Sequence, residues 1–181
     1  MKDKSVYLNN AEASYPKPGI VVKRVLSVIK NLPDEKEQIT RLCRETVSGF
    51  INSPAPESIV LTPGATYSIN LAIQGLKYPE PFHVVTTAAE HNAVYRPLYA
   101  RHDRGEIDLS VVPCDRFGRV DPEGFIRALR NETKLIVINH ISNITGFVQD
   151  LGKIIPAVKD RGALILVDAT QSAGILPIDV Q

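Results

Sequence analysis

The sequence has no tryptophan, a single methionine and only two cysteines, and it contains no apolar run long enough to cross a lipid bilayer. Its first residues lead into a polar stretch with Asn9 and Asn10, without the apolar core of a secretory signal peptide. These absences argue against a membrane protein and against a disulfide-stabilised secreted domain. We therefore expect a cytoplasmic protein with no membrane partner.

An excess of charge of either sign is missing as well. Lys and Arg total 21 residues against 20 for Asp and Glu, which gives a net charge of +1. A nucleic-acid-binding surface normally needs a basic excess, so we expect no nucleic-acid partner. What remains, 44% hydrophobic and 23% charged residues over 181 positions, is the composition of an ordinary globular protein with a sizeable core.

The two cysteines, Cys43 and Cys114, do not have the spacing of metal ligands, and we expect neither a metal site nor a disulfide between them. Cys43 falls on the apolar face of a helix pattern and is expected to be a small buried hydrophobic residue. Cys114 follows an apolar strand pattern, and we expect a structural role for it too.

Residues 1–56 are predicted to form an irregular arm followed by two helices. The segment from Tyr7 to Gly19 is polar and contains Pro16 and Pro18, which is typical of an extended arm. Apolar residues then recur at helical spacing over 20–32, and Pro33 with Asp34 breaks the chain. The pattern of the second helix places five residues on one face: Ile39, Leu42, Cys43, Val47 and Phe50.

Residues 57–181 alternate between strand and helix patterns. The predicted strands are 58–62, 82–87, 107–112, 135–139 and 163–167, and the predicted helices are 65–76, 90–104, one that starts at Asp121, and 151–160. This alternation predicts a three-layer α/β fold, in which a mostly parallel sheet is covered by helices on both faces.

The last of these strands ends in a carboxylate. Leu164 to Val167 are four large apolar residues in a row, which favours a strand buried on both faces, and Asp168 follows at its carboxyl end. Open α/β sheets bind ligands at that edge. Asp168 either caps the next turn or pairs with an arginine, or it faces a cationic nitrogen of a cofactor.

Other strand ends carry residues with two interpretations each. Gly64, Ala65 and Thr66 open a helix, where they form either a simple tight turn or a phosphate site built from free backbone N–H groups. His91 either caps a helix or stacks on an aromatic ligand. Asn143 and Gln171 are either turn residues or amide donors to a ligand.

Taken together, these segments resemble the N-terminal part of the class V aminotransferase family, in particular its cysteine desulfurase and selenocysteine lyase branch. The resemblance lies in five stretches in the family's order: Tyr7 to Pro18; Thr62 to Thr66 with Ile69 and Asn70; Glu90 to Asn92; Ser142 to Gly146; and Val167 to Gly174.

The resemblance implies a pyridoxal 5'-phosphate enzyme with the fold type I large domain. Asp168 would then pair with the pyridine nitrogen, and His91 would stack on the ring as the catalytic residue of this portion. Asn143 and Gln171 would lie near the ring's phenolic oxygen, and Ala65 and Thr66 would hold the phosphate. The substrate would be a small amino acid, most simply L-cysteine, and the full-length form would be a homodimer.

The sequence also departs from the family. All ten lysines precede Asp168, none in the setting of the Schiff-base lysine, and neither cysteine stands in the position of the catalytic cysteine. Asn9 replaces a usual Asp and Tyr67 a common Glu. We therefore expect a portion of a longer or split enzyme, inactive by itself, with two later strands of the family's sheet missing between 58–62 and 163–167.

Three interpretations of function stay open at this point. The chain is the N-terminal portion of a desulfurase or of a relative that catalyses another class V reaction, such as transamination or selenocysteine cleavage. Alternatively it is a non-catalytic product that keeps the fold and part of the cofactor site. A third interpretation is a nucleotide-binding α/β domain that uses Gly64 to Thr66 for another phosphate.

Overall fold

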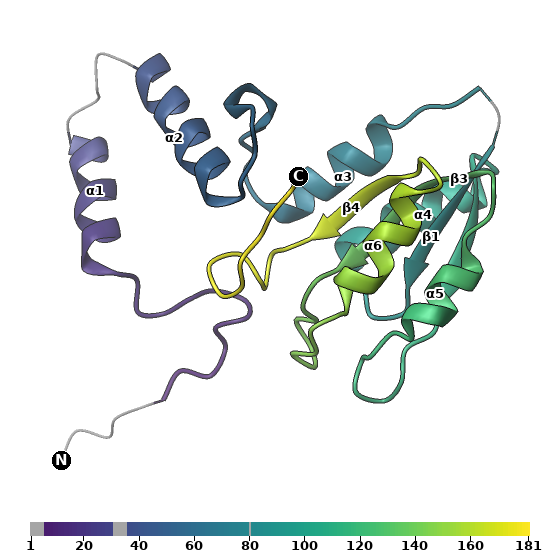
Figure 1. The fold of residues 1–181 in the computed structure, drawn as a ribbon. Helices are drawn as coiled ribbons and strands as arrows, with labels where there is room; N and C mark the ends of the chain where they lie inside the picture. The colour runs from purple at the N-terminus through teal and green to yellow at the C-terminus, as the bar shows by residue number, and fades with distance from the viewer. Residues whose placement is uncertain (1–5, 31–35, 80) are drawn as a thin grey trace. The chain divides into compact units, whose positions relative to one another are not determined.

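The computed structural model describes residues 6–30, 36–79 and 81–181 (Figure 1). The chain divides into two compact units. The first contains the residues up to Val60 together with Asp179–Gln181, and the second is Leu61–Ile178. The predicted boundary at residue 56 stays a prediction, and the two units are described in turn.

The first unit contains an irregular segment from Val6 to Pro18, helices α1 (Gly19–Lys30) and α2 (Lys36–Phe50), and the 3-10 helix η1 (Pro56–Ser58). The helices agree with the apolar spacing of the sequence, although Leu32 and the predicted break at Pro33 and Asp34 lie outside the described residues. The C-terminal residues join this unit, because the Val180 N–H donates to the Ile51 carbonyl at 3.2 Å and Asn52 donates to the Asp179 carboxylate at 3.0 Å.

The apolar faces of these two helices are not buried. Helix α1 has no buried residue, and on α2 the side chains of Leu42, Val47 and Phe50 are exposed. The prediction that Cys43 is buried is wrong for the same reason: it lies on that apolar face and is exposed with it. A hydrophobic face is buried only where a second element covers it.

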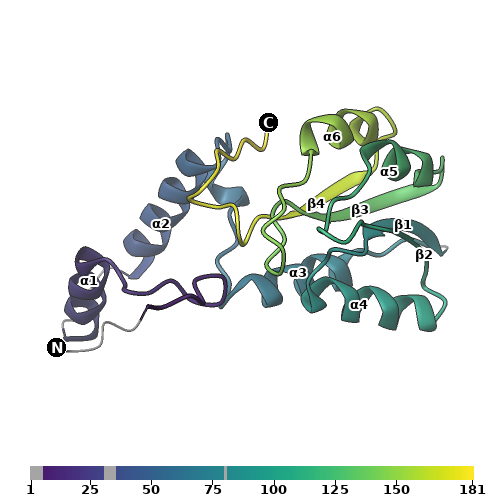
Figure 2. The same ribbon diagram turned by 90° about the horizontal axis from the view of Figure 1, so that it is seen from below.

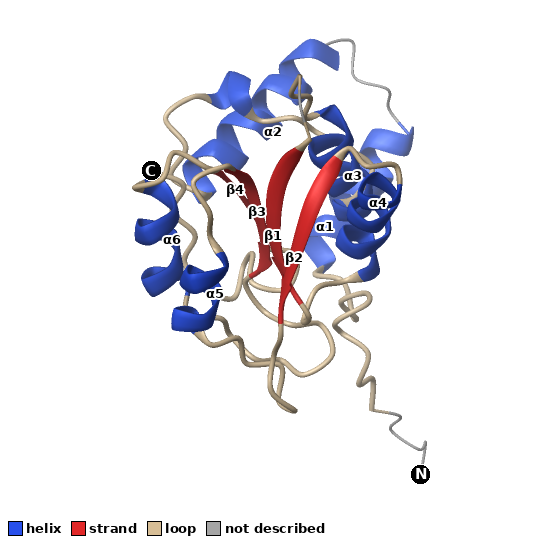
Figure 3. Cartoon of the chain, turned by 90° about the vertical axis from the view of Figure 1, so that its right-hand side faces the viewer, coloured by secondary structure: helices blue, strands red, loops and turns tan. Residues whose placement is uncertain are grey.

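The second unit is built on one sheet of four parallel strands in the order β2-β1-β3-β4. The strands are β1 (Phe82–Thr87), β2 (Ile107–Val112), β3 (Thr133–Asn139) and β4 (Leu164–Asp168). Helices α3 (Ala65–Gly75) and α4 (Asn92–Asp103) cover one face, and α5 (Pro122–Ala128) and α6 (Leu151–Lys159) cover the other (Figures 2 and 3). The predicted three-layer α/β fold is confirmed.

Two hydrophobic cores fill the space between the sheet and its helices. Successive side chains of a strand point to opposite faces. On β1, Val84 therefore packs under α3 and α4, whereas Val85 packs under α5 and α6. Ile73 and Phe125 are helical residues with no exposed surface, one in each core. Burying one such side chain contributes about 1.5–3 kcal/mol, so this unit contains most of the chain's hydrophobic stabilisation.

Polar contacts fix the helix ends of this unit. The Asp121 carboxylate accepts from the backbone N–H groups of Glu123 (3.2 Å) and Gly124 (2.9 Å), so it caps α5 as predicted. Near the end of α4, Arg101 is 5% exposed. Its Nε donates to Glu106 at 2.9 Å, its Nη1 donates to the Ile73 carbonyl at 2.5 Å, and its guanidinium lies 5.2 Å from the Phe82 ring centroid.

Two strand predictions need correction. Residues 58–62 form no strand: Pro56–Ser58 is a 3-10 helix, and the extended residues after it pair with no strand of the described chain. Strand β4 is not buried on both faces, because it is an edge strand with Leu164 49% exposed and the residues after it half-buried. A strand needs a neighbour for its ladder and for its burial, and an apolar pattern does not supply one.

No helix in the part of the chain that the structure describes is both long and apolar enough to span a bilayer.

Cys114 is half-buried and packs against the core under α5 and α6, which agrees with the structural role expected of it.

Candidate functional site

The predicted site residues of the second unit lie where parallel strands end and where helices begin. His91 follows β1, Asn143 follows β3, and Asp168 is the last residue of β4. Because all four strands are parallel, their carboxyl ends share one edge of the sheet. The structure therefore places His91, Asn143 and Asp168 at strand ends on one edge of the sheet, and their role as site residues stays a prediction.

The N-terminus of α3 is open to an anion. Gly64 is its N-cap residue with extended backbone, and no side chain caps the helix there. The space that a Cβ of Gly64 would occupy is open, and Ala65 and Thr66 are exposed. The first N–H groups of a helix lie at the positive end of its dipole. This turn consequently has the chemistry of an anion site, as the second interpretation of Gly64 to Thr66 requires.

His91 is the N-cap residue of α4 and is exposed. Its Nδ1 accepts a hydrogen bond from the Ala93 N–H at 3.0 Å, so the helix-capping interpretation is confirmed. An accepting Nδ1 carries no proton, which places the proton of the neutral ring on Nε2. Capping and ligand contact are compatible, because the cap uses one ring nitrogen and leaves the ring faces and Nε2.

The first turns of α3 and α4 are joined by one side chain. The amide nitrogen of Asn70 donates to the Thr66 carbonyl at 2.8 Å and to the Ala93 carbonyl at 3.5 Å. Thr66 lies in the candidate anion site, and the Ala93 N–H donates to the His91 ring. Asn70 therefore links the segments that carry two predicted site residues, Thr66 and His91.

Asp168 is half-buried. Its Oδ1 accepts from the backbone N–H of Thr170 at 3.0 Å and from the Thr170 hydroxyl at 2.5 Å. The turn-capping interpretation of Asp168 is therefore confirmed, and these contacts use a single carboxylate oxygen. Gln171 is half-buried in the same turn, which is closed by a Ser172 N–H to Ala169 carbonyl bond of 3.0 Å.

Asn143 is exposed in a tight loop after β3. The loop is closed by the Ser142 N–H, which donates to the Phe147 carbonyl at 3.0 Å, and the buried Ser142 hydroxyl accepts from the N–H groups of Ile144 and Thr145 at 3.3 Å each. The turn interpretation of Asn143 is confirmed. These contacts fix the backbone around Asn143 and leave its amide exposed.

The loop that contains Gly118 and Val120 is hydrogen-bonded to the loop of Asn143 through the buried Gln149. Its Nε2 donates to the Gly118 carbonyl at 2.7 Å, and its Oε1 accepts from the Val120 N–H at 3.1 Å. Gly118 has φ +82°, and a Cβ there would lie 2.7 Å from the Thr145 hydroxyl oxygen. A residue other than glycine at position 118 would therefore have a strained backbone and would require Thr145 to move.

Sequence reasoning gave Glu90 no role, although it stands beside His91. The structure places it 5% exposed between β1 and the end of β3. Its Oε1 accepts from the Thr87 hydroxyl at 2.6 Å and from the Asn139 N–H at 3.0 Å. Asn139 pairs in register with Asp168, so Glu90 joins the strand ends that carry His91 and Asp168. The only signal in the sequence was a carboxylate three residues after a strand pattern, and that signal does not predict burial.

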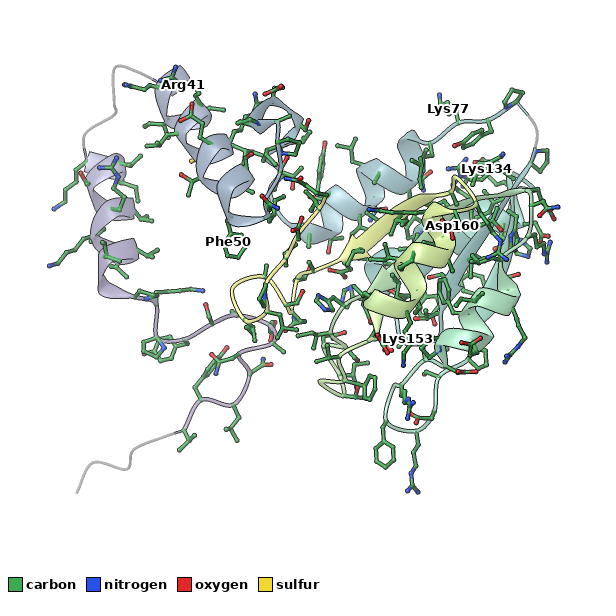
Figure 4. The ribbon with its side chains drawn as sticks, viewed as in Figure 1. Arg41, Phe50, Lys77, Lys134, Lys153 and Asp160 are labelled. Atoms are coloured by element: carbon green, nitrogen blue, oxygen red, sulfur yellow. The ribbon has the colours of Figure 1, made fainter. Side chains whose placement is uncertain are left out.

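The lysines of the second unit do not lie at the carboxyl ends of its strands. Lys134 is near the amino end of β3, Lys77 follows α3, and Lys153 on α6 lies 3.0 Å from the Asp150 carboxylate (Figure 4). Lys159 is the last residue of α6. Among the described residues of Leu61–Ile178, no lysine immediately follows a strand.

A helix start with the chemistry of an anion site, beside polar side chains on the carboxyl edge of a parallel sheet, is typical of cofactor- and nucleotide-binding α/β proteins. Comparison with known families narrows this class. The chain belongs to the family described as aminotransferase class-V, whose profile matches residues 20–181. Members of this family depend on pyridoxal phosphate.

Similar curated proteins are cysteine desulfurases. A probable cysteine desulfurase of Methanothermobacter thermautotrophicus is 40% identical over 138 residues, which cover 76% of this chain and 34% of that protein. Cysteine desulfurase IscS of Vibrio campbellii is 37% identical over 150 residues, covering 81% of this chain and 37% of that protein. The chain thus spans little more than a third of the length of these relatives.

Two solved structures share the fold. A NifS-like protein superposes with a TM-score of 0.86 at 22% identity, covering 97% of this chain and 51% of that one. The cysteine desulfurase of Thermococcus onnurineus NA1 superposes with a TM-score of 0.84 at 24% identity, covering 97% and 46%. Both likenesses extend to about half of the longer chain.

Proposed function

We propose that this chain supplies the N-terminal half of a pyridoxal phosphate site in a class V enzyme, and that the enzyme is a cysteine desulfurase. The observation that carries the proposal is the convergence of the α3 and α4 N-termini with the carboxyl ends of β3 and β4 at one edge of the sheet. The desulfurase names of the curated relatives support the choice among class V reactions.

The residues present fit this cofactor. The uncapped start of α3, with Ala65 and Thr66 exposed, suits its phosphate. Asp168 supplies a carboxylate for the pyridine nitrogen, and His91 supplies a flat ring that its cap to Ala93 holds in place. Asn143 and Gln171 supply side-chain amides for the phenolic oxygen.

When bound, the cofactor supplies an electron sink for a carbanion of the substrate. The residues of this chain would hold the cofactor in the protonated form that accepts electrons and would move a proton to or from the substrate. The Asp168 carboxylate stabilises a proton on the ring nitrogen, because opposite charges favour the protonated form. His91 holds a proton at Nε2, where it can be given to or taken from the substrate.

We propose L-cysteine as the substrate and a homodimer as the full-length form, on the strength of the desulfurase relatives. Neither Cys43 nor Cys114 is assigned the sulfur-accepting role. A second candidate is favoured by the positions of the lysines: this portion binds the cofactor without covalent attachment. In the described part of Leu61–Ile178 no lysine follows a strand end.

A binding experiment tests the proposal. We expect the 181-residue chain to bind pyridoxal phosphate, detected by its absorbance and circular dichroism, and to lose it on dialysis after borohydride treatment because no lysine is modified. His91→Ala and Asp168→Asn are each expected to weaken binding about tenfold, or about 1.4 kcal/mol. His102→Ala, at the other end of α4, and Asp160→Asn, at the end of α6, are matched controls.

Four outcomes contradict parts of the proposal. If the chain does not bind the cofactor, or if His102→Ala weakens binding as much as His91→Ala does, the assigned site is wrong. Stoichiometric borohydride labelling of one lysine would overturn the non-covalent interpretation. Displacement of the cofactor by a nucleotide at similar concentration would favour a nucleotide-binding domain.

A further inference from the structure

The turn between β1 and α4 is held to the end of β3 by a clamp of two residues, Glu90 and Asn139. Glu90 Oε1 accepts from the Asn139 backbone N–H at 3.0 Å, and the Asn139 side-chain nitrogen donates to the Ala89 carbonyl at 2.5 Å. The Thr87 hydroxyl completes the clamp with its 2.6 Å bond to the same carboxyl oxygen. His91 is the next residue, so the clamp fixes the start of the turn that presents it.

Two acceptors in this clamp have no donor. Glu90 Oε2 and Asn139 Oδ1 are buried and have no hydrogen-bond partner in the part of the chain that the structure describes. Leaving a buried acceptor unpaired costs about 1–3 kcal/mol, and a buried carboxylate costs more. A proton on Oε2 removes the buried charge and converts one unpaired acceptor into a donor, next to a residue whose own oxygen needs one.

Among the described residues, none of the groups that shift the pKa of Glu90 carries a positive charge that would favour its ionised form. Burial raises its pKa to about 7, against the opposing hydrogen bonds from Thr87 and Asn139, and the negative charge of Asp168 on β4 acts in the same direction as burial. Tyr95 on α4 faces it as well, and burial together with the Glu90 charge raises the Tyr95 pKa to about 12, so this residue stays neutral. The groups that act on Glu90 are therefore neutral or negative.

We propose that Glu90 carries a proton on Oε2 in the folded protein and acts as a positioning residue, whose neutral carboxyl keeps the β1–α4 turn and thus His91 in place. Loss of the proton introduces a buried negative charge and loosens the clamp. The protonation stands by itself, whereas its effect on the cofactor rests on the proposed function.

The first experiment measures the protonation directly. In the 181-residue chain labelled with 13C at the glutamate side-chain carboxyl, the resonance absent from Glu90→Gln belongs to Glu90. We expect it to titrate with a midpoint near pH 7, following the raised pKa. A midpoint in the ordinary glutamate range, about 4.3, would show that a water molecule or a small rearrangement satisfies an ionised carboxylate and would overturn the proposal.

The second experiment measures positioning. The Ala93 amide, which donates to the His91 ring, should change its exchange rate between pH 6 and 8.5 with the Glu90 midpoint, after correction for intrinsic exchange. Glu90→Gln keeps a neutral donor, so it should abolish this dependence and resemble the wild type at pH 6. Glu123→Gln, an exposed change on α5, should leave it intact. An unchanged pH dependence in Glu90→Gln, or a Gln variant less protected than the wild type at pH 6, would contradict the positioning role.

The link to the cofactor is tested with the same variants. We expect the ratio of pyridoxal phosphate affinities, wild type over Glu90→Gln, to fall about threefold from pH 6 to 8.5. If the ratio is constant while Glu90 titrates near 7, the link to the cofactor is wrong. If no variant binds the cofactor, the proposed function fails, and the carboxyl titration still decides the protonation of Glu90.

Discussion

Helices with the same kind of sequence pattern differ in the burial of their apolar faces between the two units of this chain. Apolar residues recur at helical spacing in α1 and α2 as they do in α3 and α6. In Leu61–Ile178 these residues are buried, with Ile73 on α3 and Ile154 on α6 fully covered, whereas in the first unit Ile29 is 72% and Phe50 51% exposed. Amphipathic spacing therefore predicts a helix but does not predict that its apolar face is covered.

The difference lies in what each helix can pack against. Helices α3 to α6 lie on a parallel sheet whose two faces offer a broad apolar surface. The described part of the first unit has no strand, and α1 has no buried residue. A lone helix of 12 residues is marginally stable in water. We expect the second unit to unfold cooperatively and the first to contribute little.

The largest expected effect compares two phenylalanines. Phe125→Ala should destabilise the second unit by about 3–5 kcal/mol, because it removes a fully buried side chain and leaves a cavity. Phe50→Ala on α2 should cost less than about 1 kcal/mol, since half of that side chain already meets solvent. Urea unfolding followed by circular dichroism measures both, and similar costs would show that the α2 face is covered in solution.

The second comparison concerns pH. The folded pKa of Glu90 is raised to about 7 while the unfolded value is near 4.5, so the folded state keeps the proton longer. Stability from this group is complete below pH 4.5, falls between 4.5 and 7, and is lost above 7. The change is on the order of 3 kcal/mol.

Urea unfolding from pH 5 to 8 checks this dependence. The difference between the wild-type and Glu90→Gln curves isolates Glu90, because the contribution of the buried His83, whose pKa burial lowers, is common to both proteins. Glu57→Gln, an exposed change in η1 of the first unit, should leave the curve unchanged. If Glu57→Gln flattens the curve as much as Glu90→Gln, the pH dependence has another source.

The third comparison uses two arginines. Arg101→Ala should cost about 2 kcal/mol, because it leaves the Ile73 carbonyl without its donor and uncovers the Phe82 ring. Arg41 on α2 pairs with Glu45 at 3.5 Å but is 73% exposed, so Arg41→Ala should cost only about 0.3 kcal/mol. Thermal unfolding of both variants at low and high salt measures this difference, and a salt-sensitive Arg101 effect would argue for charge rather than packing.

The smallest difference is expected between two buried serines, one in each unit. The Ser48 hydroxyl donates to the Ser53 carbonyl at 2.7 Å, and the Ser142 hydroxyl accepts from two N–H groups at 3.3 Å. Each Ser→Ala change should cost about 1 kcal/mol, or about fivefold faster local amide exchange. The exchange rates of the Ser53 and Thr145 amides measure these effects. A much smaller change in the exchange rate at Ser53 than at Thr145 would mean that the first unit opens as a whole.

Periodicity and turn chemistry were enough to predict most elements of the fold. Strands 82–87 and 107–112 agree with the structure to the residue, and the Asp121 cap follows from its place before Pro122. The errors have one physical origin, since strand 58–62 and the burial of Leu164 and Cys43 all depend on a partner element. A local sequence pattern does not indicate whether a partner element packs against the segment.

The candidate site was predictable in position but not in its polar interior. The parallel strand order places His91, Asn143 and Asp168 at one edge, as the alternation of elements implies. The burial of Glu90 was not predictable, because a glutamate between Ala89 and His91 is usually solvated. Only the register of β3 against β1, which brings Asn139 to Glu90, reveals it.

The close fit of Gly118 against Thr145 has a consequence for how this protein can change over evolutionary time. Any side chain at position 118 would collide with the Thr145 hydroxyl, and the glycine's positive φ disfavours such a change by itself. Gln149 bonds the Gly118 carbonyl, so the three positions share one set of contacts. We expect related sequences to vary at 118, 145 and 149 together rather than singly, and this correlation would mark the loop of Asn143 in an alignment even where Asn143 itself is replaced.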